Sequence, residues 1–533
     1  MNKAVQRVAL SVLAAVMIGG QGAYAASIES DSLQGADQRI MVNVTTWAGS
    51  GDLGSGNGTG ENVTFRIPSR LAILPDNTVL ISDSRNHLIR KLTEGRVSPY
   101  AGVLYEMDDK GFPIGGLLDG QSGGSLFHEP QGMAVDADGN VYVADAGNHA
   151  IRKIDASGRV STLAGSGLIG LTDGKGKAAS FYRPMDVAVA ADGTLYVADT
   201  LNHVIRSVSP SGEVRTLSEP SSRAVEVSPG QASPAGDFAD GELNQAKFNE
   251  PGGLVIDDKG NLYVSDSGNQ RIRYIDLQAG TVSTVAGGGA AAAKKELYVL
   301  GDYADGEASQ ARFNFPLGIA WAAEGGLIIA DSQNHAIRFV SNGRVITLAG
   351  VPGSTTGELD GIEGSARMQR PTGVAVQADG SIIVADAFNN KLRQIRLYSL
   401  PVDLPKDNNV KVVLDNQWLP FEAPPEIVAG RTMVPVRAIA EALGYQVAFD
   451  DATRAVQFSK EGVTVEITMD RTGIKRIAEG REWLTETDAA PYIKHDLTYV
   501  PVRFFAEEIG LDVQWDHGTR TAILRHKTGA TER

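Results

Sequence analysis

The sequence predicts a mainly β protein that ends in a smaller α+β region. Three observations support this class. Glycine makes up 61 of the 533 residues, short runs rich in Val, Ile and Tyr recur along most of the chain, and a duplicated segment near the end has helical spacing. A glycine content above the usual share of about 7% indicates many turns. With 42% hydrophobic residues, the chain can bury a substantial core.

The charge and the cysteine content exclude several classes of function. The chain has 49 basic and 64 acidic residues, a formal net charge of −15, and no Lys- or Arg-rich block. Because nucleic acids and anionic membranes attract basic surfaces, we expect neither as a partner. The absence of cysteine excludes disulfides, thiolate metal ligands and a cysteine nucleophile.

Residues 1–25 have the pattern of a secretory signal peptide. Lys3 and Arg7 flank the start of an apolar run over residues 8–18, and residues 23–25, Ala-Tyr-Ala, form a small-x-small cleavage site. The run is shorter than the roughly 18 residues that a transmembrane helix needs, and no other stretch approaches that length. We therefore expect a secreted protein, extracellular or associated with the cell envelope, without a transmembrane segment.

One unit recurs six times between residues 40 and 397. In every copy an Asp ends an apolar run, an Asn follows three residues later, an Arg follows seven residues later, and a Pro precedes by fifteen. A Phe stands eighteen residues before the Asp, with Met368 in its place in the last copy. The aligned pairs are Asp83 with Arg90, Asp145 with Arg152, Asp199 with Arg206, Asp266 with Arg273, Asp331 with Arg338, and Asp386 with Arg393.

Each copy carries four short strand signals separated by turn residues, as at 132–136, 141–145, 150–155 and 160–164. Such a recurring meander buries its faces only against its neighbours, as the blades of a β-propeller do. The last copy lacks a fourth strand, and residues 42–49 match the missing one. The sequence therefore predicts a six-bladed propeller that the N-terminal strand closes.

The run Asp-x-x-Asn-His-x-Ile-Arg, present at residues 145–152, resembles the signature of the NHL-repeat family. The resemblance covers roughly residues 40–397 and implies a six-bladed NHL-type β-propeller. It implies much less about function, because similar propellers serve as binding platforms, sensor domains and lyases.

Residues 398–409 are predicted to be a linker, and residues 410–527 a second domain. There the sequence VPVRAIAE at 434–441 returns as VPVRFFAE at 500–507. In each half a short helical pattern ends at a glycine, Gly444 or Gly510, and two strand signals follow. We predict a small α+β domain made of two similar halves that share one core.

This second domain resembles the stalk domain of secreted bacterial proteins, also called copper amine oxidase N-terminal-like. The resemblance implies a spacer or a module associated with the cell envelope. We expect no amine oxidase activity, because the chain has no Asn-Tyr dipeptide to supply the quinone cofactor. The histidines of this region are only His495, His517 and His526, so no copper site is carried over.

Two interpretations fit the histidines that recur at one repeat position, His87, His149, His203 and His335. They could line a zinc or copper site at the centre of the ring, or they could form local hydrogen bonds in a turn. We favour the turn, because Gln270 and Asn390 replace His in two copies and amides are poor transition-metal ligands. The Asp-Gly pairs before each Phe are weak calcium candidates. We expect no cofactor, with calcium or zinc as the alternative.

We assign the repeated Asp and Arg a structural role. The two residues flank the same hairpin in every copy. A charge-assisted hydrogen bond between them could fix the turn or tie one blade to the next.

Functional residues are expected where the repeat is broken, because scaffolding recurs in every blade and a binding site occurs once. Two residues after the Pro, four copies have a glycine, which suits an innermost strand: Gly132, Gly253, Gly318 and Gly373. Arg70 and Asp186 stand at this position in the other two copies. We place both at the channel mouth, on the face with the long connections, where they suit a polar or zwitterionic ligand. Pairing with each other as a plug is the alternative.

The two residues between the Phe and the Pro also vary from copy to copy, as a recognition surface requires. Solvated loop decoration is the alternative. The inserts 103–118, 218–237 and 288–302 are expected on the same face, where they could form a lid. The predicted ligand-binding rim comprises Arg66, His128, Glu129, Tyr182, Arg183, Asn249, Glu250, Asn314, Phe315 and Arg370.

These observations favour a secreted, non-catalytic binding or scaffold protein. The propeller would bind an extracellular protein, peptide or glycan, and the C-terminal domain would serve as a spacer or anchor on cell-wall material. The alternative is a metal-assisted lyase or hydrolase with its site at the channel mouth. No His-Glu-x-x-His motif supports a zinc hydrolase.

Overall fold

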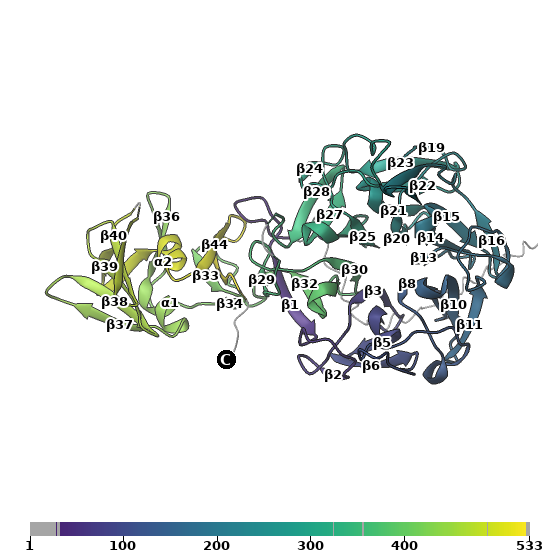
Figure 1. Ribbon diagram of the computed structural model, residues 1–533. Coiled ribbons are helices and arrows are strands. Elements are labelled where there is room, and N and C mark those ends of the chain that lie inside the picture. Colours follow the sequence, from purple (N-terminus) through teal and green to yellow (C-terminus); the bar gives the residue numbers. More distant parts are fainter. Residues whose placement is uncertain (1–27, 29–31, 323, 354–355, 488, 529–533) are drawn as a thin grey trace, which may run out of the picture.

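The computed structural model describes residues 28, 32–322, 324–353, 356–487 and 489–528. The predicted signal peptide, residues 1–25, lies outside the described residues. The chain forms a ring of β-sheets and a smaller lobe beside it (Figure 1), so the mainly β prediction is confirmed. Across the described part of the chain, we find no helix with the length and apolar character needed to cross a membrane.

Six five-stranded sheets built from residues 42–397 stand around a common centre (Figure 1). In the second sheet, β8 (Pro130–Val135) is innermost, and β9 (Val141–Asp145), β10 (Ala150–Ile154) and β11 (Arg159–Ala164) follow outwards. The four strand signals of this copy are therefore confirmed. A fifth strand that the sequence did not suggest, β7 (Gly120–Gln121), begins at the Asp-Gly pair and covers the outer edge of β11.

The other sheets repeat this order. From the innermost to the outermost strand, the first sheet contains β3 (Pro68–Ile73), β4 (Val79–Asp83), β5 (Leu88–Thr93), β6 (Arg96–Ala101) and β2 (Gly58–Thr59), and the third contains β13 (Pro184–Val189), β14 (Leu195–Asp199), β15 (Val204–Val208), β16 (Glu213–Thr216) and β12 (Gly174–Lys175). The fourth sheet contains β20 (Pro251–Ile256), β21 (Leu262–Asp266), β22 (Arg271–Asp276), β23 (Thr281–Ala286) and β19 (Gly241–Glu242), and the fifth contains β25 (Pro316–Trp321), β26 (Leu327–Asp331), β27 (Ala336–Ser341), β28 (Arg344–Ala349) and β24 (Gly306–Glu307). The sixth sheet contains β30 (Pro371–Val376), β31 (Ile382–Asp386), β32 (Lys391–Leu397), β1 (Val42–Ala48) and β29 (Gly361–Ile362).

A one-turn 3-10 helix joins the second and third strands of every sheet and contains the repeated Asn. These turns are η1 (Ser84–Asn86), η3 (Ala146–Asn148), η5 (Thr200–Asn202), η6 (Ser267–Asn269), η7 (Ser332–Asn334) and η8 (Ala387–Asn389). Two further turns, η2 (Ser122–Gly124) and η4 (Gly176–Ala178), follow β7 and β12.

The N-terminal strand completes the last sheet, as predicted. β1 pairs antiparallel with β32 and takes the place of the missing fourth strand. Innermost strands of neighbouring sheets contact one another all round the ring, including β3 with β30. Closure therefore leaves neither end of the repeat with an exposed sheet edge.

Apolar side chains fill every junction between neighbouring sheets. Phe127 belongs to one buried cluster with Leu80 and Ile89 of the first sheet and Val141 and Val143 of the second. Equivalent clusters occupy the other five junctions. The repeated Phe is completely buried, and burial of one such side chain stabilises the fold by about 1.5–3 kcal/mol.

The innermost strands approach one another so closely that a side chain has no room at the glycine position. A Cβ on Gly318 would lie 2.6 Å from the carbonyl oxygen of Thr372 and 2.8 Å from the Cα of Gly373. A Cβ on Gly253 would lie 2.2 Å from the carbonyl oxygen of Leu317. These backbone contacts explain why small residues recur there.

The smaller lobe is the predicted α+β domain. One sheet has the strand order β34 (Gln417–Trp418), β33 (Lys411–Leu414), β45 (Thr521–His526), β44 (Leu511–Asp516). A second has the order β35 (Glu426–Val428), β36 (Arg431–Pro435), β43 (Leu497–Pro501), β42 (Tyr492–Lys494). A third has the order β37 (Gln446–Asp450), β38 (Ala455–Lys460), β39 (Val463–Thr468), β40 (Gly473–Ala478), β41 (Arg481–Glu486). Its helices are α1 (Val436–Ala442) and α2 (Val502–Glu508). Strands β39–β41 were not expected from the sequence.

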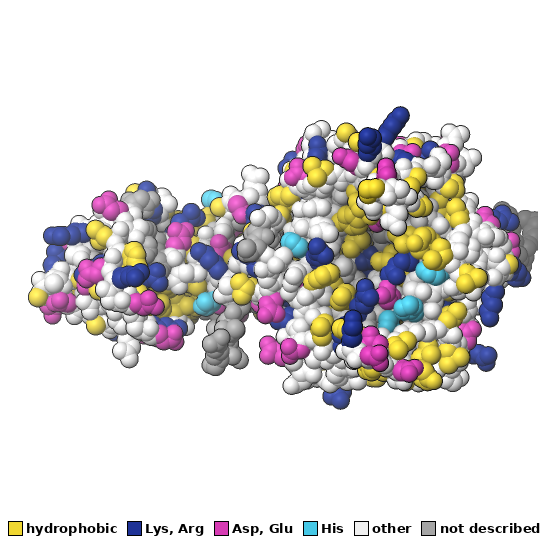
Figure 2. All heavy atoms as spheres, in the orientation of Figure 1, with side chains coloured by type: hydrophobic (Ala, Val, Ile, Leu, Met, Phe, Trp, Pro, Cys, Tyr) yellow, Lys and Arg dark blue, Asp and Glu magenta, His cyan; other side chains and the backbone are white. Residues whose placement is uncertain are grey.

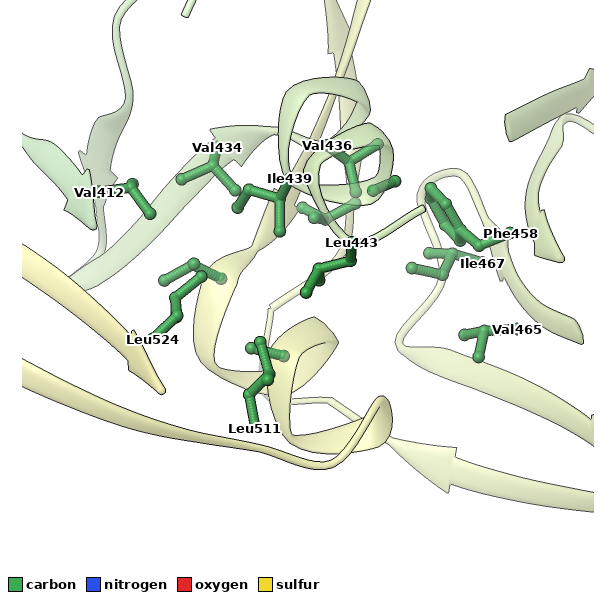
Figure 3. Close-up of a cluster of buried hydrophobic side chains, with 14 of the residues drawn as sticks. Val412, Val434, Val436, Ile439, Leu443, Phe458, Val465, Ile467, Leu511 and Leu524 are labelled. Atoms are coloured by element: carbon green, nitrogen blue, oxygen red, sulfur yellow. The ribbon is translucent and has the colours of Figure 1, made fainter. Parts of the chain in front are cut away.

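The two halves of this domain meet at β36 and β43, which pair antiparallel with Val434 opposite Val500. Figure 3 shows that side chains of both halves, such as Ile439 and Leu511, point into one cluster. The prediction of two similar halves sharing one core is confirmed.

A buried ion pair joins the lobe to the ring. The Arg525 guanidinium contacts both carboxylate oxygens of Glu363, at 2.6 and 3.0 Å, and also Asp512 at 2.9 Å. Glu363 accepts a further hydrogen bond from the backbone N–H of Val42. Residues 398–410 form no strand or helix, but Tyr398, at the start of the predicted linker, is buried in this contact.

We predict that Gly318→Ala destabilises the ring by about 1–3 kcal/mol, because the new methyl group would push two innermost strands apart. Gly123→Ala is the matched control, since a Cβ there would meet no atom within 4 Å. Urea unfolding of the full chain measures both. Equal stability of the two variants would contradict the close packing at the axis.

Candidate functional site

The repeated Asp is the centre of a buried hydrogen-bond network in each sheet. The Asp145 carboxylate accepts hydrogen bonds from Arg152 at 2.7 Å, from Asn148 at 2.8 Å and from the backbone N–H of His128 at 2.8 Å. The same three contacts recur at Asp83, Asp199, Asp266, Asp331 and Asp386.

The repeated Arg holds the segment that enters each sheet. Arg152 donates to the carbonyl oxygens of Leu118 and Leu126 and to the Asp119 carboxylate, and its guanidinium lies 4.9 Å from the Phe127 ring centroid. Every partner belongs to the same repeat copy. The pair therefore fixes structure within a sheet and does not tie one blade to the next. Asp119, a calcium candidate by sequence, is engaged by this arginine.

Substitution of the repeated Arg, which pairs with the buried Asp, would destabilise the fold. Burial raises the pKa of Asp83, Asp199 and Asp331 to about 6, and the neighbouring guanidinium opposes that rise. Each carboxylate nevertheless lies 2.6–2.8 Å from a nitrogen of its arginine and forms an ion pair with it. Loss of one member of a buried ion pair costs about 3–5 kcal/mol, which supports the structural role predicted for the repeated Asp and Arg.

The repeated histidine ties each blade to the next. His149 follows the 3-10 turn with φ of 51°, and its Nδ1 accepts a hydrogen bond from the backbone N–H of Arg183 in the next sheet, at 3.1 Å. Five further bonds complete the circle: Glu129 to His87, Glu250 to His203, Phe315 to Gln270, Arg370 to His335, and Ile67 to Asn390.

This contact corrects the expectation of local hydrogen bonding, because the acceptor serves the neighbouring blade. It also explains the substitutions, since an amide oxygen can accept the same bond that Nδ1 accepts. The Nδ1 atoms are directed at backbone N–H groups of the rim. In the part of the chain that the structure describes, no group of three or more His, Asp or Glu residues is arranged to hold a metal ion.

Arg70 and Asp186 meet inside the channel. The Arg70 guanidinium donates to the carbonyl oxygens of Gly252, at 2.6 Å, and Thr372, and its Nε lies 3.9 Å from Asp186 Oδ2. Asp186 accepts the backbone N–H of Leu254 at 3.0 Å, and burial raises its pKa to about 6 against the opposing effect of Arg70. The two side chains therefore form the plug named above as the alternative.

Their position differs from the predicted one. Both residues are buried, and they border a cavity of about 310 Å³ whose walls include Val187, Ile319 and Val374. These wall residues belong to the halves of the innermost strands that run away from the rim. The cavity therefore lies on the side opposite the long connections. The sequence could not show this, because it depends on which way the side chains point along the axis.

The predicted rim residues do lie together with the long connections. In each of the six copies, the residue immediately before the repeated Pro has a φ between 47° and 55°. Glu129 lies between Arg85, at 2.6 Å, and Arg183, at 2.5 Å. Glu250 accepts a hydrogen bond from the hydroxyl of Tyr298, a residue of the insert 288–302. The rim charges are therefore largely engaged with one another and with the inserts.

Aromatic contacts occupy most of the other predicted rim residues. The Arg66 guanidinium lies over Phe112 and that of Arg370 over Phe388, at 5.1 and 4.9 Å. Rings also meet between His87 and His128, and between His149 and Tyr182. Asn249 donates to the carbonyl oxygen of Leu297 at 2.7 Å.

The inserts 218–237 and 288–302 form an apolar surface beside this rim. The insert 218–237 contains the hairpin β17 (Ala224–Ser228) and β18 (Gln231–Pro234), and its Arg223 donates to carbonyl oxygens of Ala293, Glu296 and Leu297. A cavity of about 570 Å³ lies between these inserts, lined also by Asn314 and Phe315.

Several large apolar side chains of the connections are exposed. Figure 2 shows apolar side chains gathered around a central hollow in which charged and histidine side chains appear. The expected rim did not include these residues, although apolar residues within the connections were a visible signal in the sequence. The most exposed are Leu300 (89%) and Tyr105 (73%), of the inserts 288–302 and 103–118, and Leu168 (72%) and Ile169 (60%), of the shorter connection between β11 and β12.

The histidines of the small domain do not fit a copper site. His526 Nδ1 lies 2.8 Å from Asp415, and His517 accepts a hydrogen bond from the Trp515 indole. His495 lies in the turn between β42 and β43 with φ of 50°. No cluster of ligands joins them among the described residues.

Family models match both parts of the chain. The NHL repeat model matches residues 65–92, 127–154 and 248–273, and the copper amine oxidase N-terminal domain model matches residues 413–524. The chain contains NHL repeats and a copper amine oxidase N-terminal domain. The chain is 31% identical over 353 residues to "Protein SUPPRESSOR OF QUENCHING 1, chloroplastic" of Arabidopsis thaliana, covering 62% of this chain and 30% of that protein.

The NHL propeller also has a human relative, "NHL repeat-containing protein 2", 30% identical over 334 residues, which are 58% of this chain and 44% of that one. The chain thus spans less than half the length of these relatives. An auxiliary nutrient binding protein of Bacteroides thetaiotaomicron superposes with a TM-score of 0.47 at 18% identity, over 67% of this chain and 77% of that one. These matches establish no enzyme activity for this chain.

We predict that His203→Gln reduces the pH dependence of stability. Burial, and then the charge of Arg223, lower the pKa of His203 from 6.5 to about 4. The unfolded chain therefore binds the proton more readily, so the stability from neutral His203 is complete above pH 6.5 and is lost as the pH falls towards 4. Gln270 shows that an amide accepts the same bond.

Urea unfolding at pH 7.5 and at pH 5 checks this. Between these values the wild-type chain should lose roughly 1–2 kcal/mol more than His203→Gln. The buried aspartates titrate in both proteins, so the comparison isolates this imidazole. Parallel pH curves would contradict the neutral acceptor role.

Proposed function

We propose that this protein is an exported, non-catalytic binding protein. The long-connection face of its NHL propeller binds a partner protein or peptide, and its C-terminal domain holds the propeller at the cell envelope. The exposed apolar side chains of the long connections carry this proposal. Monomeric proteins seldom leave such groups exposed together on one face unless they mark an interaction site.

The rim supports a binding role more than a catalytic one. Its charged residues are paired across neighbouring blades, as Glu129 is with Arg85 and Arg183. The histidine Nδ1 atoms accept backbone hydrogen bonds. The groups that a lyase or hydrolase would need at the mouth therefore have structural partners. What remains accessible is an apolar surface with an ordered polar border, which is the usual anatomy of a protein interface.

A partner with apolar side chains in an extended segment suits the cavity beside Phe315. That cavity measures about 570 Å³ and is bordered by Leu297, Tyr298 and Leu300. The Tyr298 and Phe315 rings pack edge to face with centroids 5.3 Å apart, which gives the cavity a firm aromatic wall. A peptide could bury one large side chain there while polar groups of the rim contact its backbone.

The buried ion pair between Glu363 and Arg525 supports the spacer role of the C-terminal domain. A spacer that is to present one face of the propeller must hold a defined direction. Two guanidinium–carboxylate bonds restrict rotation more than a single flexible linker does.

We predict that a phage-displayed library of 12-residue peptides, selected on the immobilised full chain, yields binders rich in large apolar residues. Leu300→Asp should weaken these binders at least tenfold, because the charge would lie on the docking surface. Val402→Asp, in the linker and at least as exposed as Leu300, is the matched control. Failure to enrich any peptide, or binding that ignores Leu300→Asp, would disprove the docking face.

We also predict that the full chain sediments with purified cell-wall sacculi at physiological salt, because an envelope spacer must bind wall material. Serum albumin, another acidic protein, serves as the control. A full chain that stays in the supernatant as albumin does would disprove the envelope role.

A further inference from the structure

A second cavity, of about 900 Å³, lies in the C-terminal domain. Its walls come from the turn between β35 and β36, from α2 and from the hairpin of β44 and β45. The polar and aromatic residues that matter most here are Arg503 and Glu507 of α2, and Trp515, His517 and Arg520 of the hairpin. We call this cavity the stalk groove.

The duplication gives an internal reference for the stalk groove. Arg520 corresponds to Arg454 of the first half, which pairs with Asp470 at 3.0 Å. The side chains of Arg520 and Arg503 have no ion-pair or hydrogen-bond partner among the described residues. Arg520 thus lacks the kind of partner that Arg454 has, whereas Arg503 and its counterpart Arg437 both have none among the described residues.

Two further residues at the wall of the stalk groove differ from their counterparts in the first half. Phe449 is replaced by Trp515, and Asp451 is replaced by His517. The second change removes a negative charge next to the arginines. The Trp515 indole N–H donates to His517 Nδ1 at 3.2 Å, with the two rings nearly perpendicular at 83°. This bond holds the indole in one orientation at the wall of the groove.

These features together indicate the chemistry of a ligand. A guanidinium with free N–H groups recognises a carboxylate in a planar, two-bonded manner. A fixed indole offers a wide, flat apolar face and contributes strongly to binding. The volume lies in the usual range of about 300–1,000 Å³ for ligand sites. A sugar ring that bears a carboxylate presents both complementary parts, a flat ring and an anionic group.

We propose that the stalk groove binds an acidic glycan, a polysaccharide segment that contains carboxylate-bearing sugars. The proposal deepens the envelope role given above and rests on it, because it names the groove through which the C-terminal domain would hold wall material. A peptide rich in acidic residues is the competing occupant, which the flat indole and the polar walls favour less.

Calorimetric titration of the full chain with octagalacturonate tests the proposal. Maltooctaose is the neutral sugar control, and a peptide of eight glutamates is the control for charge alone. We expect octagalacturonate to bind, and Arg503→Gln and Arg520→Gln each to weaken it at least tenfold. Arg437→Gln and Arg454→Gln, the same changes at the duplicated positions, should leave binding unchanged. Trp515→Phe, which keeps an aromatic ring in place, should weaken it less than the arginine variants do.

Three results would overturn the proposal: no binding of octagalacturonate, equal binding of the glutamate peptide, or equal effects of the matched arginine variants. Sedimentation with sacculi separates this failure from failure of the envelope role. A full chain that sediments but ignores octagalacturonate disproves only the groove. A full chain that binds octagalacturonate but does not sediment disproves the envelope role.

Discussion

The junction between neighbouring sheets is the constraint on which the ring depends. Each junction combines a buried Phe or Met with a hydrogen bond from the backbone N–H of one blade to a side-chain acceptor of the blade before it. The residue that donates this N–H has positive φ and precedes a proline, so it cannot join a regular ladder. An unpaired N–H there would cost about 1–3 kcal/mol. Six such contacts close the circle from Ile67 to Asn390.

This constraint separates the framework from the variable surface. The Asp and Arg of each copy form hydrogen bonds that hold the entering segment against its own sheet. The His or amide side chain accepts a hydrogen bond from the next sheet. The side chains of the connections do not form these repeated hydrogen bonds. The connections can therefore change in length and composition, and the exposed apolar residues accumulate in them.

The contact between the ring and the small domain follows different physics. Arg525 is almost completely buried, yet it satisfies its charge with Glu363 and Asp512 together. A buried pair of this kind adds little net stability over apolar packing, but it is directional. It therefore suits a joint whose purpose is to set the orientation of two bodies, and it leaves both the long-connection face and the stalk groove accessible.

Much of the fold was predictable from the sequence because its determinants are local and repeated. The Asp, Asn, Arg and Pro spacings lie within one hairpin and its entering segment, so their register shows the strands, the turns and the completion of the last sheet by residues 42–49. The halves of the small domain were visible for the same reason, since Val434 and Val500 begin matching segments. The variable rim could also be located, because it occupies one fixed place in each copy.

The tertiary structure alone decided which groups meet across these local units. The sequence placed Arg70 and Asp186 near the axis, but only the convergence of innermost strands buries them together. It showed a recurring histidine, but not that the acceptor serves the next blade. Glu363 and Arg525 are 162 residues apart, and no pattern links them. Sequence patterns record neighbours along the chain, whereas these contacts depend on how completed sheets pack against one another.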